Sequence, residues 1–183
     1  MGVAPVRWIL DDGPLGVLAE TVGPAPLASW PAGELLIAEQ TAADAAVDKS
    51  GRRAGLLTVQ ADGKRVIDVI RVPLGSQAAH ILYHHLGRGS DDTEDRAERQ
   101  AIAWAIAVDT DSVFVTHDKR AALTALAELG RCRVAHTFDL WMHLRASGRL
   151  AADQFDQLCE RTARRDDGLP GVPWRVRPSD TGR

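Results

Sequence analysis

Two aspartates stand directly behind short apolar segments that are typical of buried strands. Asp11 follows residues 6–10, and Asp118 follows residues 113–116 after one intervening histidine. If the two strands are parallel neighbours, their carboxyl ends open onto one crevice, which is where open α/β sheets place ligands. We therefore expect these two carboxylates to lie close together.

Glu98 is the third candidate, within a segment that is expected to be a helix. It precedes Ala101 and Ile102 and lies at the border of their apolar stripe, so its side chain is expected to face the end of the sheet. Three carboxylates at one spot repel each other and persist mainly where a hard cation neutralises them. The sequence thus predicts a Mg²⁺ or Mn²⁺ site, with Thr116 as a hydrogen-bond partner of one carboxylate.

Each candidate could also have a purely structural role. Asp11 opens an Asp-x-Gly-Pro sequence, which favours a chain reversal, and Asp118 directly precedes a helix, where Asp is a preferred cap. Asp12 is expected to be a better cap than Asp11, because it immediately precedes Gly13 and Pro14. The aspartates alone therefore do not separate catalysis from chain geometry.

The elements that must position these side chains alternate between strands and helices, which predicts an α/β three-layer fold with a mostly parallel sheet. Strands are expected over residues 6–10, 113–116 and 131–135. An added β-hairpin is expected from residues 56–60 and 65–72 around Ala61-Asp62-Gly63-Lys64. Helices are expected over residues 15–20, 34–47, 76–86, 119–129, 138–147 and 151–164, with another from the capping residues at 90–93 to about 108.

Length and composition indicate one ordinary globular domain. The chain has 183 residues, of which 45% are hydrophobic and 26% charged, and its net charge of −3 does not suggest a dedicated nucleic-acid binder. We divide it into a domain at 1–165 and a basic tail at 166–183 that contains Pro and Gly and is expected to be flexible. Two cysteines without a CxxC spacing, no secretory signal and no membrane-length apolar run predict a cytoplasmic protein.

The order of these motifs resembles that of the PIN-domain nucleases. Residues 9–15, Ile-Leu-Asp-Asp-Gly-Pro-Leu, are similar to the opening strand and turn of that family. Residues 98–105 are similar to the Glu-x-x-Ala-Ile helix of one subgroup, and residues 113–118 to the apolar strand and Thr-x-Asp that carry its last acidic position. The resemblance covers roughly residues 5 to 160.

The resemblance implies a metal-dependent ribonuclease that hydrolyses RNA phosphodiester bonds, as do the toxins of toxin–antitoxin pairs. Asp11, Glu98 and Asp118 would then be metal ligands, and Glu39 a further ligand or a water-positioning group. The usual spacing before this second acidic position is not reproduced, so Glu34 competes with Glu39. RNA and an antitoxin protein are the implied partners, and a homodimer is also compatible with the sequence.

Two further hypotheses stay open at this level. The chain could be a catalytically inactive PIN-like module that binds protein or RNA, or its basic tail could mask its own site. Phosphate contacts could come from a group of basic residues around the expected hairpin, which could equally be solvated surface charges: Lys49, Arg52, Arg53, Lys64, Arg65 and Arg71.

Overall fold

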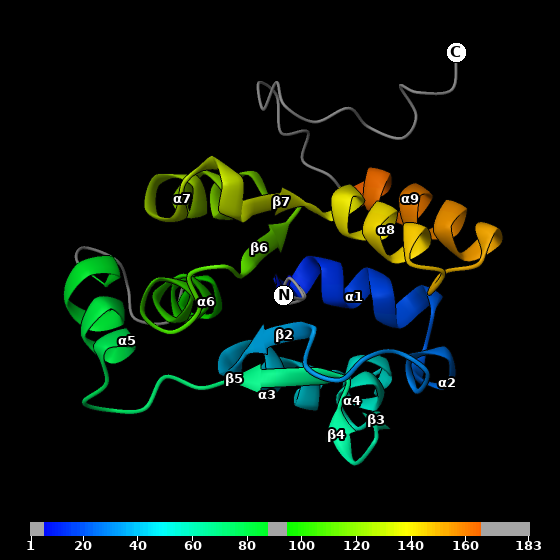
Figure 1. Ribbon diagram of the computed structural model, residues 1–183, viewed down its shortest axis with the longest axis horizontal. Helices are drawn as coiled ribbons and strands as arrows, with labels where there is room; N and C mark the ends of the chain where they lie inside the picture. The colour runs from blue at the N-terminus through cyan, green and yellow to red at the C-terminus, as the bar shows by residue number, and fades with distance from the viewer. Residues whose placement is uncertain (1–5, 88–94, 166–183) are drawn as a thin grey trace, which may run out of the picture.

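The computed structural model describes residues 6–87 and 95–165, and its centre is a five-stranded parallel sheet (Figure 1). The strands are β1 (Trp8–Leu10), β2 (Leu35–Ala38), β5 (Ile67–Ile70), β6 (Val113–Thr116) and β7 (Val134–His136). Their order is β5-β2-β1-β6-β7, so β1 lies in the middle with β2 and β6 as neighbours. A separate two-stranded hairpin pairs β3 (Gln60–Ala61) with β4 (Lys64–Arg65). The predicted α/β fold with an added hairpin is confirmed.

Helices cover both faces of the sheet (Figure 1). They are α1 (Asp12–Thr21), α2 (Pro24–Leu27), α3 (Glu39–Val47), α4 (Arg52–Leu57), α5 (Gln77–His80), α6 (Arg96–Ala107), α7 (Lys119–Leu129), α8 (Thr137–Ala146) and α9 (Ala152–Arg165). A π-helical segment, Ile81–Leu86, continues α5, and a 3₁₀ turn, Arg131–Arg133, precedes β7. Crossover helices between parallel strands require this layered arrangement.

Alternating side chains of each strand build two separate cores. Leu10 and Val115 face one core, which α1, α4, α8 and α9 close. Ile9 and Phe114 face the other, which α6 and α7 close. Full burial of one such side chain contributes about 1.5–3 kcal/mol, so both faces fix the register of β1 against β6. That register places the ends of both strands side by side.

The helix predicted over residues 34–47 is wrong in its first part. Residues Leu35–Ala38 form β2, and the helix α3 begins only at Glu39. All four residues of β2 are buried, because the strand lies inside the sheet with helices on both faces. A strand buried on both faces is a continuous apolar run, and periodicity alone cannot distinguish such a run from a buried helical segment.

The predicted hairpin strands are too long. Leu56 and Leu57 belong to α4, and only two residues pair on each side of the turn. Beyond the hairpin, Ile67–Ile70 (β5) has no partner in the hairpin and pairs instead with β2, as a parallel strand of the central sheet. Ile67 and Ile70 are buried there, and this burial explains why the chain leaves the hairpin for the larger sheet.

The later elements agree closely with the sequence. Helix α7 has the predicted bounds, and the strand predicted over 131–135 is divided into the 3₁₀ turn and β7. The predicted helix start at 90–93 and the tail at 166–183 lie outside the described residues. Within the described ranges, no helix is long and apolar enough to span a membrane.

Candidate metal centre

Asp11 connects the end of β1 to the start of α1. Its Oδ1 accepts a hydrogen bond from Asp12 N at 2.8 Å, so Asp11, and not Asp12 as the sequence predicted, caps the helix. Its own N–H donates to Val115 O at 3.0 Å, which ties it to β6. Burial raises the pKa of Asp11 to about 6, and the charges of Asp12 and Asp118 act in the same direction.

Thr116 joins the two strand-end aspartates through one hydroxyl group. Its Oγ1 donates to Asp11 Oδ2 at 2.7 Å and accepts from Asp118 N at 3.0 Å. The side chain is 1% exposed, so water does not compete for these bonds. Thr116 therefore fixes the orientation of Asp11 relative to the loop that carries Asp118.

Asp118 is the N-cap of α7, the structural role that its position before a helix predicted. Its Oδ1 accepts from Ala121 N at 2.8 Å. The cap uses one carboxylate oxygen, and Oδ2 has no hydrogen-bond donor among the residues that the structure describes. Capping and metal ligation are thus compatible at this residue, because a carboxylate has two oxygens with several acceptor sites.

Glu98 stands in the first turn of α6 and is partly buried. Burial, together with the charges of Asp11, Asp95 and Asp118, raises its pKa to about 8, against a lowering effect of Arg120. The structure therefore places Asp11 and Asp118 at the carboxyl end of the sheet, and the charges of both act on Glu98. We call Asp11, Glu98 and Asp118 the acid cluster.

The charges of Asp95 and Arg120 also act on Glu98, although the sequence did not single these two residues out. Asp95 precedes α6 with a φ of 59°, a conformation that is uncommon for a residue other than glycine. Its carboxylate pairs with Arg120 at 2.7 Å. The spacing of three residues between Asp95, the N-cap of α6, and Glu98 was the signal in the sequence that could have linked them. Residues three apart at a helix start can lie on the same side.

The two glutamates that competed for the second acidic position lie at opposite ends of β2. Glu39 begins α3 at the carboxyl end, exposed, on the same edge as Asp11. Glu34 precedes the strand and is 6% exposed. Burial opposes ionisation of Glu34, yet hydrogen bonds from Arg149 and His143 outweigh it and lower its pKa. Glu34 is therefore committed to an ion pair away from the cluster.

A hydrogen bond links the start of α3 to the helix of Glu98. Gln40 N donates to Gln100 Oε1 at 3.0 Å. Gln100 lies two residues after Glu98, and Gln40 lies one residue after Glu39. This bond fixes the two helix starts relative to each other at the edge of the sheet.

Gly13 permits the close approach of α1 to the loop before α7. A Cβ atom at this position would lie 2.6 Å from the Cε1 and Nε2 atoms of His117. His117 is buried, and its Nδ1 lies 3.2 Å from Thr137 Oγ1. The glycine is thus needed for the approach of the segments that carry Asp11 and Asp118.

The donor set fits a hard divalent cation in its chemistry. It consists of carboxylate oxygens, which Mg²⁺ and Mn²⁺ prefer, and two of the groups have pKa values raised by burial and by neighbouring carboxylates. Within the described ranges, however, no group of three or more His, Cys, Asp or Glu side chains is already arranged to hold an ion.

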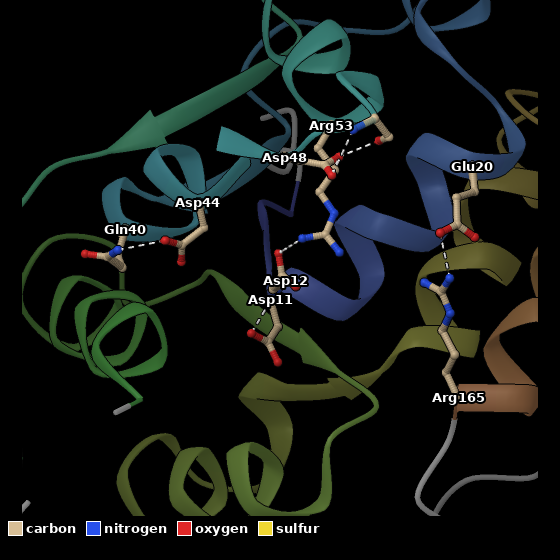
Figure 2. Close-up of polar contacts among 9 residues, drawn as sticks. Asp11, Asp12, Glu20, Gln40, Asp44, Asp48, Arg53 and Arg165 are labelled. Carbon is tan, nitrogen blue, oxygen red and sulfur yellow. Dashed lines mark hydrogen bonds and ion pairs between the residues drawn. The ribbon is translucent and has the colours of Figure 1, made fainter. Parts of the chain in front are cut away.

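The basic residues named from the sequence divide into two groups. Arg53 is partly buried and pairs with Asp12 at 2.6 Å, beside Asp11 (Figure 2). The other five residues are exposed: Lys49, Arg52, Lys64, Arg65 and Arg71. Only Arg53 is therefore connected to the cluster by a contact between described residues.

Comparisons with protein-family models, with curated proteins and with solved structures found no match to this chain.

Proposed function

We propose that this protein is a metal-dependent ribonuclease of PIN type, which hydrolyses RNA phosphodiester bonds with Mg²⁺ or Mn²⁺. The observation that supports the proposal is the raised pKa of Asp11 and of Glu98, to which burial and the charge of Asp118 both contribute, beside the carboxyl end of a parallel sheet. Carboxyl groups whose pKa values are raised by burial and by neighbouring charges, near the end of a parallel strand, are candidates for a functional site.

Each residue of the cluster has a separate task in this proposal. Asp11, Glu98 and Asp118 hold the ion, and Thr116 keeps Asp11 in position through the bond to its Oδ2. Glu39, at the same edge, is a further ligand or positions a water molecule. A bound divalent ion lowers the pKa of its water and stabilises charge on a phosphoryl oxygen.

The raised pKa of Glu98 links ion binding to proton release. At neutral pH this carboxyl is largely protonated, because its pKa is about 8. A metal ligand must be deprotonated, so binding of the ion releases the proton. The affinity for the ion therefore increases with pH through the neutral range.

RNA as the substrate and an antitoxin as the partner come from the resemblance of the motifs to PIN toxins. An antitoxin segment with an arginine fits an acidic crevice, because a guanidinium group can bind two carboxylate oxygens at once. The pairing of Arg120 with Asp95 already shows a guanidinium at the edge of this cluster.

The competing proposal is a catalytically inactive PIN-like module that binds protein or RNA. The exposed position of Glu39 supports it, because Glu39, the candidate for the second acidic position, is in contact with solvent and Asp11 is partly buried. Cleavage activity separates the two proposals, since both allow RNA binding.

The test is cleavage of a labelled single-stranded RNA in Mn²⁺ by the full chain and by Asp118→Asn. We expect cleavage that stops in EDTA and falls about a hundredfold or more in the variant, because the substitution removes a ligand of the ion. Asp153→Asn, at the exposed start of α9, is the matched control and keeps full activity. Equal cleavage by Asp118→Asn and the control contradicts the proposal, and RNA binding without cleavage favours the inactive module.

A further inference from the structure

Two arginines from distant parts of the chain reach over the same glycine of α1. A Cβ atom on Gly16 would lie 3.0 Å from Arg53 Nη2 and 3.5 Å from Arg165 Nη1. Arg53 comes from α4 and Arg165 from the end of α9, so only the tertiary fold brings them together. Gly16 lets both guanidinium groups lie against the helix at one point.

Carboxylates on the same face of α1 hold the two arginines. Arg53 Nη1 lies 2.6 Å from Asp12 Oδ1, and Arg165 Nη2 lies 2.6 Å from Glu20 Oε1 (Figure 2). Asp12 and Glu20 stand four residues before and four residues after Gly16, which places all three on one helix face. The arginines are thereby oriented before any ligand arrives.

Three guanidinium groups gather along this face. Arg161 also pairs with Glu20, at 2.9 Å, so among the described residues three arginines pair with two carboxylates of α1, and the charge of Asp48 also acts on Arg53. The side chains of Arg53 and Arg165 are 28% and 40% exposed and remain accessible to a ligand. Each guanidinium group has five N–H donors, more than its ion pair uses.

The two arginines, Arg53 and Arg165, lie along the helix that begins beside Asp11 of the acid cluster. Asp12, the partner of Arg53, directly follows Asp11, and from there the face extends along α1 by about 12 Å to Glu20. An anionic strand that enters the cluster would be repelled by its carboxylates and attracted by the guanidinium groups beside it. Arginine suits this task, because its planar fork matches phosphate oxygens.

We propose that Arg53 and Arg165 bind a backbone phosphate of the RNA strand and hold that strand beside the acid cluster. The choice of RNA as the polyanion rests on the proposed function. The two arginines act in binding and positioning, and the net charge of −3 is compatible with such a local basic face.

Binding of a short, fluorescently labelled single-stranded RNA to the full chain in EDTA tests the pair. We expect Arg53→Gln and Arg165→Gln each to weaken binding severalfold and the double variant by about tenfold or more. The slope of log affinity against log salt is negative, and it should become less steep by about 0.7 for each phosphate that a variant no longer neutralises. Arg53→Lys keeps the charge and should retain most of that slope. Arg164→Gln is the matched control, because Arg164 is exposed on the same helix and pairs only with Glu160 among the described residues.

The outcomes separate this inference from the proposed function. Cleavage in Mn²⁺ together with unchanged RNA affinity of the double variant overturns the arginine pair and leaves the nuclease standing. Arginine-dependent binding without cleavage supports the pair and contradicts the nuclease. If Arg164→Gln weakens binding as much as the double variant, or if the wild-type chain binds no RNA, the pair is overturned. Thermal unfolding of each variant shows whether a loss of binding comes from a loss of fold.

Discussion

At the scale of single residues, several side chains of the acid cluster serve the fold as well as the proposed chemistry. Asp11 and Asp118 cap helices α1 and α7, and Thr116 binds both residues through one hydroxyl group. Capping fixes where each carboxylate stands, and the proximity of the carboxylates then helps to raise the pKa of Glu98. Two of the three carboxylates, those of Asp11 and Asp118, are therefore held in position by their capping bonds although their charges repel each other.

Asp118→Asn separates the two roles of this residue. Asn caps helices about as well as Asp, so the fold should keep its stability or gain slightly from reduced repulsion. The affinity for Mn²⁺ should fall about tenfold or more, because an amide is a weaker ligand for a hard cation than a carboxylate. Calorimetric titration with Mn²⁺ measures this, and an unchanged affinity would mean that Asp118 is only a cap.

The raised pKa values predict a pH dependence of stability without added metal. Between about pH 4.5 and 8 the folded state holds a proton on Glu98 that the unfolded state has released. Stability therefore falls as pH rises through this window, and Asp11 adds a further fall between about pH 3.8 and 6. Melting temperatures in EDTA at pH 5 and pH 8.5 measure the effect.

Glu98→Gln is the control for this dependence. A neutral side chain at position 98 cannot lose a proton, so the decrease in melting temperature above pH 6 should become clearly smaller. A variant that shows the same pH profile as the wild-type chain would exclude Glu98 as its source.

At the scale of elements, the site depends on how closely α1 approaches the loop between β6 and α7. The strands place their ends side by side through the register of Leu10 with Val115. The helix start at Gly13 then packs against His117 without a side chain between them. The distance between the two caps is thus set by packing on both sides of the sheet end.

Gly13→Ala should destabilise the protein by about 1–3 kcal/mol, the usual effect of an added methyl group in a tightly packed region. The buried His117 ring, 2.6 Å from the new Cβ, would have to move. Such a loss lowers the melting temperature of a chain of this size by about 2–4 °C per kcal/mol. Thermal unfolding measures the change.

Gly55→Ala provides the matched control in helix α4. Apart from its chain neighbours and the backbone of its own helix, no described residue has an atom within 4 Å of a Cβ at this position, and its φ is not positive. We expect a stabilisation of about 0.4–1 kcal/mol, because alanine restricts the unfolded chain. Equal effects of the two alanines would show that the contact with His117 is unimportant.

At the scale of the whole molecule, the two ends of β2 have different tasks. The amino end is fixed by Glu34, which lies 3.0 Å from His143 of α8 and 2.6 Å from Arg149 beyond that helix. The carboxyl end carries Glu39 beside the acid cluster. The ion pairs of Glu34 that stabilise the fold and the residues of the proposed metal site therefore lie at opposite ends of β2.

Glu34→Gln tests this separation. The substitution leaves Arg149, which is 17% exposed, without its charged partner, and should cost about 1–3 kcal/mol of stability. Mn²⁺ affinity should stay unchanged, because the acid cluster lies at the other end of the sheet. Unfolding and calorimetric titration of the same sample measure both quantities, and a weakened Mn²⁺ site would contradict the separation.

Local sequence signals determined the α/β class and most of the helices. The bounds of α7 were predicted correctly, because a capping aspartate and a terminal glycine mark its ends. Asp11, Glu98 and Asp118 could be selected because strand ends and helix stripes are visible in the pattern of apolar residues. The placement of Asp11 and Asp118 at one sheet end follows from the parallel pairing of β1 with β6.

Only the tertiary structure decided what depends on neighbours that are distant in the chain. Residues 35–38 form a strand because the sheet buries both of its faces, and a short apolar run contains no sign of that burial. Glu34 is held at the amino end of β2 by contacts with Arg149 and His143, more than a hundred residues away. The Asp95–Arg120 pair and the meeting of Arg53 with Arg165 over Gly16 arise in the same way. Such contacts depend on packing, which a local pattern of residues does not specify.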